Sequence, residues 1–159
     1  FRSILTSDMK RDLPKYISDF ANKDIQFYNV TDIVEFNNKD TLTHAPYGQY
    51  IFNEIKEDKV SDSELEQMKI KTKSQATNYL NKIMTINDFD IFISVDNSMA
   101  GIAAAAHFPA LTVPMGYRSD GQPSNITFIA KSKNEQLLYN IAYRYEKQSK
   151  RRVAPKKYN

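Results

Sequence analysis

The stretch DIFISVDNSMAGIAAAAHFPALTVPMGYRSDGQPSNITFIA, residues 90–130, decides the fold class of this chain. Residues 91–95 are β-branched or aromatic apart from one serine and lie between two aspartates, which predicts a buried strand. The small residues at 99–106 predict a helix that lies close to a sheet, and residues 110–113 predict a second strand. A strand, a helix and a strand at this spacing predict a right-handed βαβ unit, with the two strands parallel.

The residues after this unit predict a hairpin and a closing helix. The cluster SDGQP at 119–123 is typical of a turn, so residues 126–130 are expected to return as a third, antiparallel strand. Ser132 and Glu135 have the spacing of a capping box for a helix over residues 132–152. The expected fold class is therefore α/β, with a small mixed sheet covered by helices. That sheet combines a parallel βαβ unit with an antiparallel hairpin.

The first half of the chain is predicted to be helical. Ser61 and Glu64 form a capping box, and apolar residues then recur at spacings of three and four, which predicts the longest helix over residues 61–87. Residues 1–60 predict short helices joined by turns, with Pro14 near the start of one of them. We expect a single domain over residues 1–159, in which residues 90–130 form the sheet unit.

The charge of the chain gives no domain-wide basic face. The sequence has 159 residues, 22 Lys and Arg, 19 Asp and Glu, and a formal net charge of +3. We therefore expect no nucleic-acid partner. Basic residues at the end of the closing helix favour the negative pole of its dipole, although binding of an anionic surface through them stays an alternative. These residues are Lys147, Lys150, Arg151, Arg152, Lys156 and Lys157.

The composition also narrows the chemistry. The sequence has no cysteine and two histidines far apart, so we expect neither a metal site nor a cofactor. The longest apolar candidate, residues 102–106, is much shorter than the roughly 20 residues that span a bilayer. We expect a soluble chain. The sequence does not determine its compartment, but the cytoplasm is favoured.

A polar loop after the first strand is the best candidate for a binding pocket. Asp96, Asn97, Ser98 and Met99 follow the carboxyl end of a strand expected to be parallel, which is where α/β folds place ligands. We predict that these four residues bind substrate. An alternative interpretation is that Asn97 or Ser98 only caps the following helix, and both roles are compatible.

Two other combinations of residues have the composition of a catalytic site without its context. Ser7 and Lys10 have the S-x-x-K spacing of penicillin-binding enzymes, but the companion motifs are missing, which favours an exposed pair on a helix. Ser98, His107 and Asp96 contain the residue types of a triad, which carry little information without geometry. We expect no catalytic residue in this chain.

Several motifs together resemble the C-terminal end of the amidase signature family of hydrolases. They are AAHFPALTVPMG at 105–116, DGQP at 120–123, EQLL at 135–138 and a basic run before Pro155. A weaker similarity lies in VTDIVEFN at 30–37 and PYGQ at 46–49. The resemblance implies a partial amidase-signature fold over most of the chain.

The resemblance also implies where the chemistry lies in such enzymes. A serine attacks the amide carbonyl, a second serine relays the proton, and a lysine acts as the base. These residues belong to a Gly/Ser-rich N-terminal half, and nothing in this sequence matches them. Two departures concern the sheet unit. Asp96 and Asn97 stand where the family often has proline and threonine, and His107 stands where a glycine commonly ends the helix.

The implied function is the C-terminal portion of an amidase signature serine hydrolase, whose intact parent hydrolyses a carboxamide C–N bond. This portion would supply scaffold and part of the substrate pocket, and it would be inactive alone. The expected partners are an amide-type small-molecule substrate in the intact parent and the missing N-terminal half of the same domain. Self-association or structural compensation is expected as well. The alternative is a standalone binding or scaffolding module derived from the amidase fold.

Overall fold

The computed structural model describes residues 1–154. The basic residues Lys156 and Lys157 therefore lie outside the described residues. The chain divides into two compact units, one formed by residues 1–69 and a second that begins at Ile70. The long helix α5 (Asp62–Ile86) contributes its first turns to the first unit and its remaining turns to the second. The prediction of a single domain stays a prediction.

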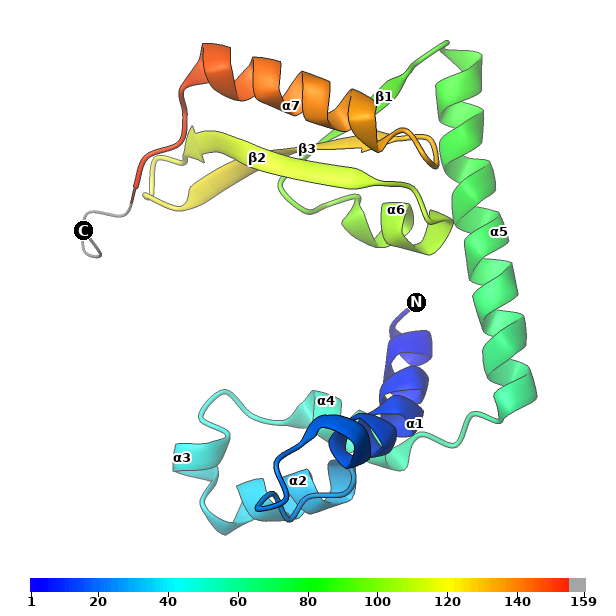
Figure 1. Cartoon of the computed structure of the whole chain (residues 1–159), viewed down its shortest axis with the longest axis vertical. Helices are drawn as coiled ribbons and strands as arrows, with labels where there is room; N and C mark the ends of the chain where they lie inside the picture. Colours follow the sequence, from blue (N-terminus) through cyan, green and yellow to red (C-terminus); the bar gives the residue numbers. More distant parts are fainter. Residues whose placement is uncertain (155–159) are drawn as a thin grey trace. The chain divides into compact units, whose positions relative to one another are not determined.

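The first unit is helical (Figure 1). It contains α1 (Arg2–Phe20), α2 (Val30–Lys39), α3 (Thr41–His44) and α4 (Tyr50–Glu57), and α4 packs against both α1 and α2. These short helices are marginal alone and depend on burial of their apolar residues. The buried apolar residues of this unit are Ile4, Val30, Val34, Ile55 and Leu65.

Helix α1 contradicts the prediction of a helix that begins near Pro14. The helix begins at Arg2, and Pro14 lies inside it. A proline in a helix interior removes one hydrogen bond and costs roughly 3 kcal/mol. Tertiary contacts outweigh this cost. The Lys10 ammonium donates to the carbonyl of Lys56 over 2.9 Å, and Arg11 Nε donates to Asp62 Oδ1 over 2.8 Å.

The second unit contains a three-stranded sheet (Figure 1). Strands β1 (Ile91–Val95), β2 (Ala110–Tyr117) and β3 (Pro123–Ala130) lie in the order β1-β3-β2, and both neighbouring pairs are antiparallel. The α/β fold class is confirmed. One detail of the predicted mixed sheet is corrected: β1 and β2 are parallel, but β3 lies between them. Local sequence patterns specify a crossover, but they do not specify which strand fills the gap.

Helices cover the two faces of this sheet. Because side chains alternate along a strand, Ile129 of β3 faces one layer while Phe128 and Ala130 face the other. Ile129 packs with residues of α5 and of α6 (Ala100–Ala106), whereas Phe128 and Ala130 pack with α7 (Glu135–Ser149). The first cluster is Leu80, Met84, Ala103, Ala106, Phe108 and Ile129. The second is Val113, Phe128, Ala130, Leu138 and Ala142.

The two predicted capping boxes have different outcomes. The Ser61 box is confirmed, since Ser61 N donates to Glu64 Oε2 over 2.9 Å and Glu64 N donates to Ser61 Oγ over 3.4 Å. The Ser132 box is wrong. Lys133 has a φ of 67°, and α7 begins at Glu135 after Asn134. The left-handed residue directs the chain into the helix two positions later than the spacing predicts. Within residues 1–154, every helix is too short or too polar to cross a bilayer.

Candidate functional site

The loop that follows β1 is fixed by the carboxylate of Asp96. Its Oδ1 atom accepts hydrogen bonds from Asn125 N over 2.8 Å and from Ser124 Oγ over 3.0 Å, and its Oδ2 atom pairs with Arg118. The Asn125 N–H, with further help from Ser124 and Arg118, holds the pKa of Asp96 below its ordinary value. The carboxylate is therefore ionised at neutral pH, and its oxygens are already occupied by protein donors.

The backbone of Asp96 is held as firmly as its side chain. Asp96 N donates to Asn125 O over 2.7 Å, and the Thr127 hydroxyl donates to Asp96 O. Asp96 has a φ of 52°, in the left-handed region that non-glycine residues seldom occupy. These bonds hold an uncommon conformation, so Asp96 orients the loop instead of presenting a free carboxylate.

The other three predicted pocket residues lie on the same loop. Asn97 and Ser98 are exposed, while Met99 is partly buried against the cluster around Leu80. Ser98 Oγ donates to Val95 O over 3.0 Å. The alternative role as a helix cap is wrong for both polar residues, because Met99 is the N-cap of α6 and makes no side-chain capping bond. The hydroxyl of Ser98 instead closes the turn behind it.

A row of hydroxyl groups crosses the sheet beside this loop, and the sequence interpretation missed it. Ser94 of β1 is paired with Thr127 of β3, which is paired with Thr112 of β2. The Oγ1 atoms of the two threonines lie 2.8 Å apart. The buried Ser94 Oγ has no hydrogen-bond partner among the described residues. Only the strand register places these residues in one row, and no local motif indicates that register.

His107 lies at the C-terminus of α6 and has a φ of 57°. Its N–H donates to the carbonyl groups of Ala103 and Ala104. The prediction that His107 occupies the C-terminal position of this helix is confirmed. Ser98 and His107 flank the seven residues of α6, which span about 10 Å, so the triad has no geometric support.

Ser7 and Lys10 are also structural. Ser7 is fully buried and its hydroxyl donates to Asp58 Oδ1 over 2.9 Å, while the Lys10 ammonium donates to Lys56 O and Asp58 O. The prediction of an exposed pair is wrong, because the chain after α4 covers this face of α1. The two groups are not arranged as a nucleophile and its base, since Ser7 donates its hydrogen bond to Asp58 and the Lys10 ammonium donates to backbone carbonyls instead of contacting the serine.

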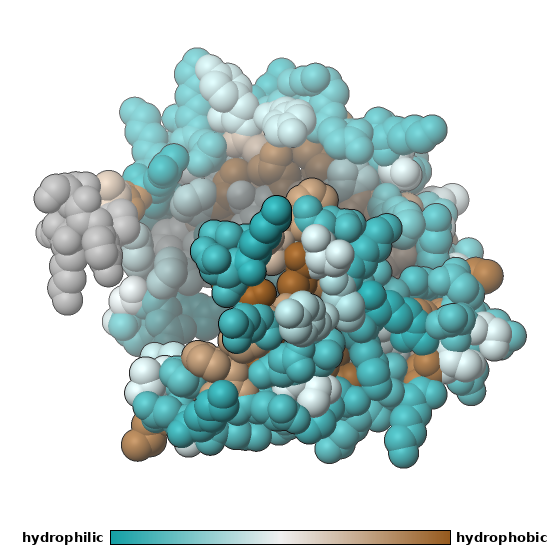
Figure 2. All heavy atoms as spheres, turned by 60° about the horizontal axis from the view of Figure 1, so that its bottom comes forward, coloured by the Kyte–Doolittle hydropathy of each residue, from teal (hydrophilic) through white to brown (hydrophobic). Residues whose placement is uncertain are grey.

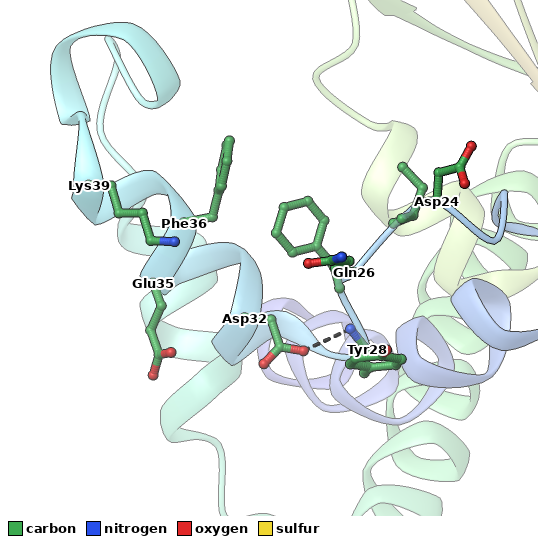
Figure 3. A pocket seen from close by; sticks show the side chains of 9 residues that line it. Asp24, Gln26, Tyr28, Asp32, Glu35, Phe36 and Lys39 are labelled. Carbon is green, nitrogen blue, oxygen red and sulfur yellow. Dashed lines mark hydrogen bonds between the residues drawn. The ribbon is translucent and has the colours of Figure 1, made fainter.

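A hollow of about 560 Å³ lies beside α2 in the first unit (Figure 3). Aromatic side chains form much of its wall, and the rings of Phe27 and Phe36 meet edge to face with centroids 5.2 Å apart. The Asp32 carboxylate accepts a backbone hydrogen bond, since Tyr28 N donates to its Oδ2 over 2.7 Å. The hollow is lined by Asp24, Ile25, Gln26, Phe27, Tyr28, Asp32, Glu35, Phe36 and Lys39.

A second hollow, of about 510 Å³, lies between α1 and α4, and its lining is mainly apolar. Arg2 borders it and is held by Glu54, whose Oε2 accepts from Arg2 Nε over 2.9 Å. Figure 2 shows that some hydrophobic residues reach the surface of the molecule among mainly hydrophilic ones. The residues that line this hollow are Arg2, Leu5, Thr6, Met9, Ile51, Phe52 and Ile55.

Comparison with known proteins places these features in a family. The chain is 30% identical to an amidase family protein from Bacillus anthracis str. Ames, with a TM-score of 0.85 over 96% of the chain. The chain is an amidase-family homologue. A probable amidase of Arabidopsis thaliana is 22% identical over 154 residues, which are 96% of the chain and 30% of that protein. No family model matches the sequence.

A further solved amidase shares the fold. The native peptide amidase from Stenotrophomonas maltophilia is 22% identical to the present chain, with a TM-score of 0.74. The match covers 97% of the present chain and 34% of the peptide amidase. The homologue spans about 30% of the length of the Bacillus and Arabidopsis proteins. This coverage is consistent with the predicted C-terminal portion of an amidase.

Proposed function

We propose that this amidase homologue serves as the C-terminal portion of a serine hydrolase that cleaves a carboxamide C–N bond. The observation that carries the proposal is the match to the Bacillus amidase family protein, which covers 96% of this chain and 30% of that one. In this proposal the attacking serine, the second serine and the lysine belong to polypeptide outside the matched portion. The chain itself supplies scaffold and one wall of the pocket.

The pocket wall is assigned to the loop from Asp96 to Met99. The hydrogen bond from Asn125 N to Asp96 fixes the loop, so the exposed side chains beside Asp96 are attached to a backbone of fixed conformation. Preorganised polar groups lose less entropy on binding than mobile ones. A rigid loop that ends in exposed polar side chains is therefore suited to orient a small polar group.

Two side chains of the loop match the groups of a carboxamide. Asn97 is exposed and carries both a donor and an acceptor. The Ser98 hydroxyl donates a hydrogen bond to Val95 O, so the lone pairs of its oxygen can accept a hydrogen bond from an amide N–H. A carboxylic acid offers no such N–H when ionised. We therefore expect the loop to prefer a primary carboxamide over the matching carboxylate.

A binding experiment tests the pocket. The purified chain, labelled with ¹⁵N, is titrated with benzamide and with benzoate while amide chemical shifts are recorded. We expect benzamide to shift the amides of residues 96–99 more than benzoate does, and we expect Asn97→Ala with Ser98→Ala to remove the difference. Ser119→Ala, an exposed change in the hairpin turn, is the matched control. Equal shifts with both ligands would contradict the assignment.

A labelling experiment tests the division of labour. The chain is incubated with a fluorophosphonate probe that reacts with activated serines, and with a panel of simple carboxamides. We expect neither stoichiometric labelling nor turnover, because Ser7 and Lys10, the pair with the spacing of a nucleophile and its base, are both engaged by Asp58. Labelling of any serine in the chain would overturn the proposal that the reactive groups lie elsewhere.

A further inference from the structure

The outer face of α7 carries cations and tyrosines. Leu138 and Ala142 of this helix are buried, and the helix lies along one face of the sheet (Figure 1). Helical spacing places Tyr143 and Lys147 on the side opposite these two residues. The exposed residues that we call the outer face are Tyr139, Asn140, Tyr143, Arg144, Lys147 and Lys150. None of these six residues is acidic.

The cations of this region are not neutralised by neighbouring carboxylates. Glu135 and Glu146, the two acidic residues of α7, lie together on one flank of the helix, away from the centre of the outer face. Within residues 1–154, five exposed cations at and beyond this face form no ion pair. They are Arg144, Lys147, Lys150, Arg151 and Arg152.

Compensation of the helix dipole accounts for only part of this cluster. The favourable effect of a cation is confined to the last turn of a helix. Lys147 lies in the last turn of α7 and Lys150 is its C-cap, whereas Arg144 lies before that turn. Arg151 and Arg152 lie beyond the cap. Three of the five cations therefore need another explanation.

The chain that follows α7 is held against the sheet. The Tyr117 hydroxyl donates to Val153 O over 3.3 Å. The Cδ atom of Arg151 lies 3.9 Å from the position that a Cβ atom at Gly116 would occupy. Arg151 and Arg152 therefore belong to the folded surface, and they extend the cations of α7 past the end of the helix.

Two tyrosine rings lie beside the cations. Tyr139 is 61% exposed and Tyr143 is 66% exposed, and they are neighbours one turn apart on the helix. The Lys147 ammonium lies 5.8 Å from the centroid of the Tyr143 ring, which is within the range of a cation–π interaction. Tyrosine has an apolar ring and a polar hydroxyl, so it is favoured where an apolar phase meets water.

We propose that the outer face of α7, together with Arg151 and Arg152, binds peripherally to the surface of an anionic lipid bilayer. The cations contact lipid phosphates, and the two tyrosine rings lie at the level of the headgroups. Each Lys or Arg near an anionic leaflet strengthens binding about fivefold, so five cations together supply on the order of a thousandfold. This binding is independent of the proposed hydrolase function.

A single-stranded nucleic acid is a poorer partner for the same groups. Proteins bind such strands in a positively charged groove that follows the phosphate backbone. The outer face of a helix is a ridge, and residues of α7 line neither the hollow beside α2 nor the hollow between α1 and α4. The surface of a bilayer can contact a ridge without a groove.

Co-sedimentation of the full chain with lipid vesicles tests the proposal. One set of vesicles contains phosphatidylcholine alone, and the other contains equal parts of phosphatidylcholine and phosphatidylglycerol. We expect the chain to bind only the vesicles with phosphatidylglycerol at low salt. Binding should be lost near 1 M salt, where the screening length falls to about 3 Å.

Two double variants with the same net charge distinguish this face from the charge of the whole chain. Lys147→Gln with Lys150→Gln should weaken binding to the anionic vesicles about 25-fold. Lys71→Gln with Lys73→Gln, at exposed positions of α5, should change it by less than about twofold. Arg144→Gln, with an expected loss of about fivefold, provides a second test should the first pair reduce stability.

A fluorescence experiment tests the position of the tyrosines. The sequence has no tryptophan, so Tyr143→Trp introduces a single reporter. Its emission should move to shorter wavelength when anionic vesicles are added, because the ring enters a less polar environment. Tyr28→Trp, at an exposed tyrosine of the first unit, should show no such shift.

Four results would overturn the proposal. They are no binding to anionic vesicles at low salt, equal losses in the two double variants, an unshifted emission from a bound Tyr143→Trp chain, and tighter binding of a single-stranded oligo-dT than of the anionic vesicles. The last result would assign the outer face of α7 to nucleic acid. None of them bears on the hydrolase proposal, which the carboxamide and fluorophosphonate experiments test.

Discussion

The carboxylate oxygen Oδ1 of Asp96 lies 2.8 Å from the backbone nitrogen of Asn125. The two residues are distant in sequence but face each other where β1 ends and β3 runs alongside it. The bond, together with those from Ser124 and Arg118, turns a flexible strand end into a fixed one. The proposed pocket wall therefore depends on the ionised form of one side chain.

The stability of the sheet unit should depend on the ionisation of Asp96. Because its pKa is lowered in the folded protein, its contribution is present above the unfolded pKa of about 3.9 and is lost as the pH falls through the folded value. Asp96→Asn should therefore lower the free energy of unfolding by a constant amount between about pH 5 and 8. The difference from the wild type should shrink below about pH 4.

Urea unfolding at a series of pH values measures this difference. Glu146→Gln, at an exposed carboxylate on α7, provides the control and should show no comparable pH-dependent loss. The difference in the free energy of unfolding between Asp96→Asn and the wild type could instead stay constant down to about pH 2.5, which is about 1.4 pH units below the unfolded pKa. That result would contradict the role given to the Asp96 carboxylate.

The cluster between the sheet and α5 should dominate the stability of the second unit. Leu80 is fully buried among Met84, Ala106 and Ile129, so Leu80→Ala should cost about 2–5 kcal/mol in the free energy of unfolding. Ile70 lies on the same helix and is 69% exposed, so Ile70→Ala should change it by less than about 0.5 kcal/mol. Denaturant unfolding monitored by circular dichroism distinguishes these values, and similar losses would be inconsistent with this core.

The two threonines of the hydroxyl row should not be equivalent. Thr127 is 1% exposed and its hydroxyl donates a hydrogen bond to Asp96 O. Thr127→Val should therefore lower the free energy of unfolding by about 1–3 kcal/mol, because that carbonyl loses its donor. Thr112 is exposed, and water can replace its partner, so Thr112→Val should cost less. A double-mutant cycle measured by urea unfolding gives the coupling between them. Equal single costs with no coupling would argue against the row.

His107 should be a position at which a glycine stabilises the protein. A left-handed conformation costs a non-glycine residue about 1–2 kcal/mol, and glycine adds an unfolded-state entropy cost of roughly 0.5–1 kcal/mol. The first term is larger, so His107→Gly should raise the free energy of unfolding by about 0.5–1 kcal/mol. His107→Ala keeps the strain and should give no gain. A lower urea midpoint for the glycine variant would show that the imidazole contributes more than the strain costs.

Much of the fold was predictable because its signals are local. Helix α5 was predicted within one residue at each end, since Ser61 and Glu64 form its cap and apolar residues follow the helical period. Strand β1 was predicted with its exact bounds from five residues. Pro14 was misinterpreted because the contacts that hold α1 come from Lys56 of α4 and from Asp62 after it, which are distant in sequence. The position of β3 between β1 and β2 likewise depends on pairing that no local pattern specifies.

The candidate site was predictable as a location but not as an arrangement. The loop from Asp96 to Met99 was found from its place after a strand. The partners that occupy Asp96 lie on β3 and its hairpin, so the structural role of this carboxylate required the strand register. The link from Thr127 to Asp96 O required the same register. Sequence patterns identify residues able to act, whereas the register determines which of them are already engaged.

The strand order has a consequence for the order of folding. Strand β1 leaves the ribosome first, but its only neighbour in the described sheet is the last strand to be made. The hairpin of β2 and β3 closes over a short turn and forms its contacts at low loop-closure cost. Strand β1 must wait, and it joins a hairpin that already exists. During synthesis the segment IFISV therefore spends time without a pairing partner, and an unpaired apolar strand is prone to aggregation over that interval.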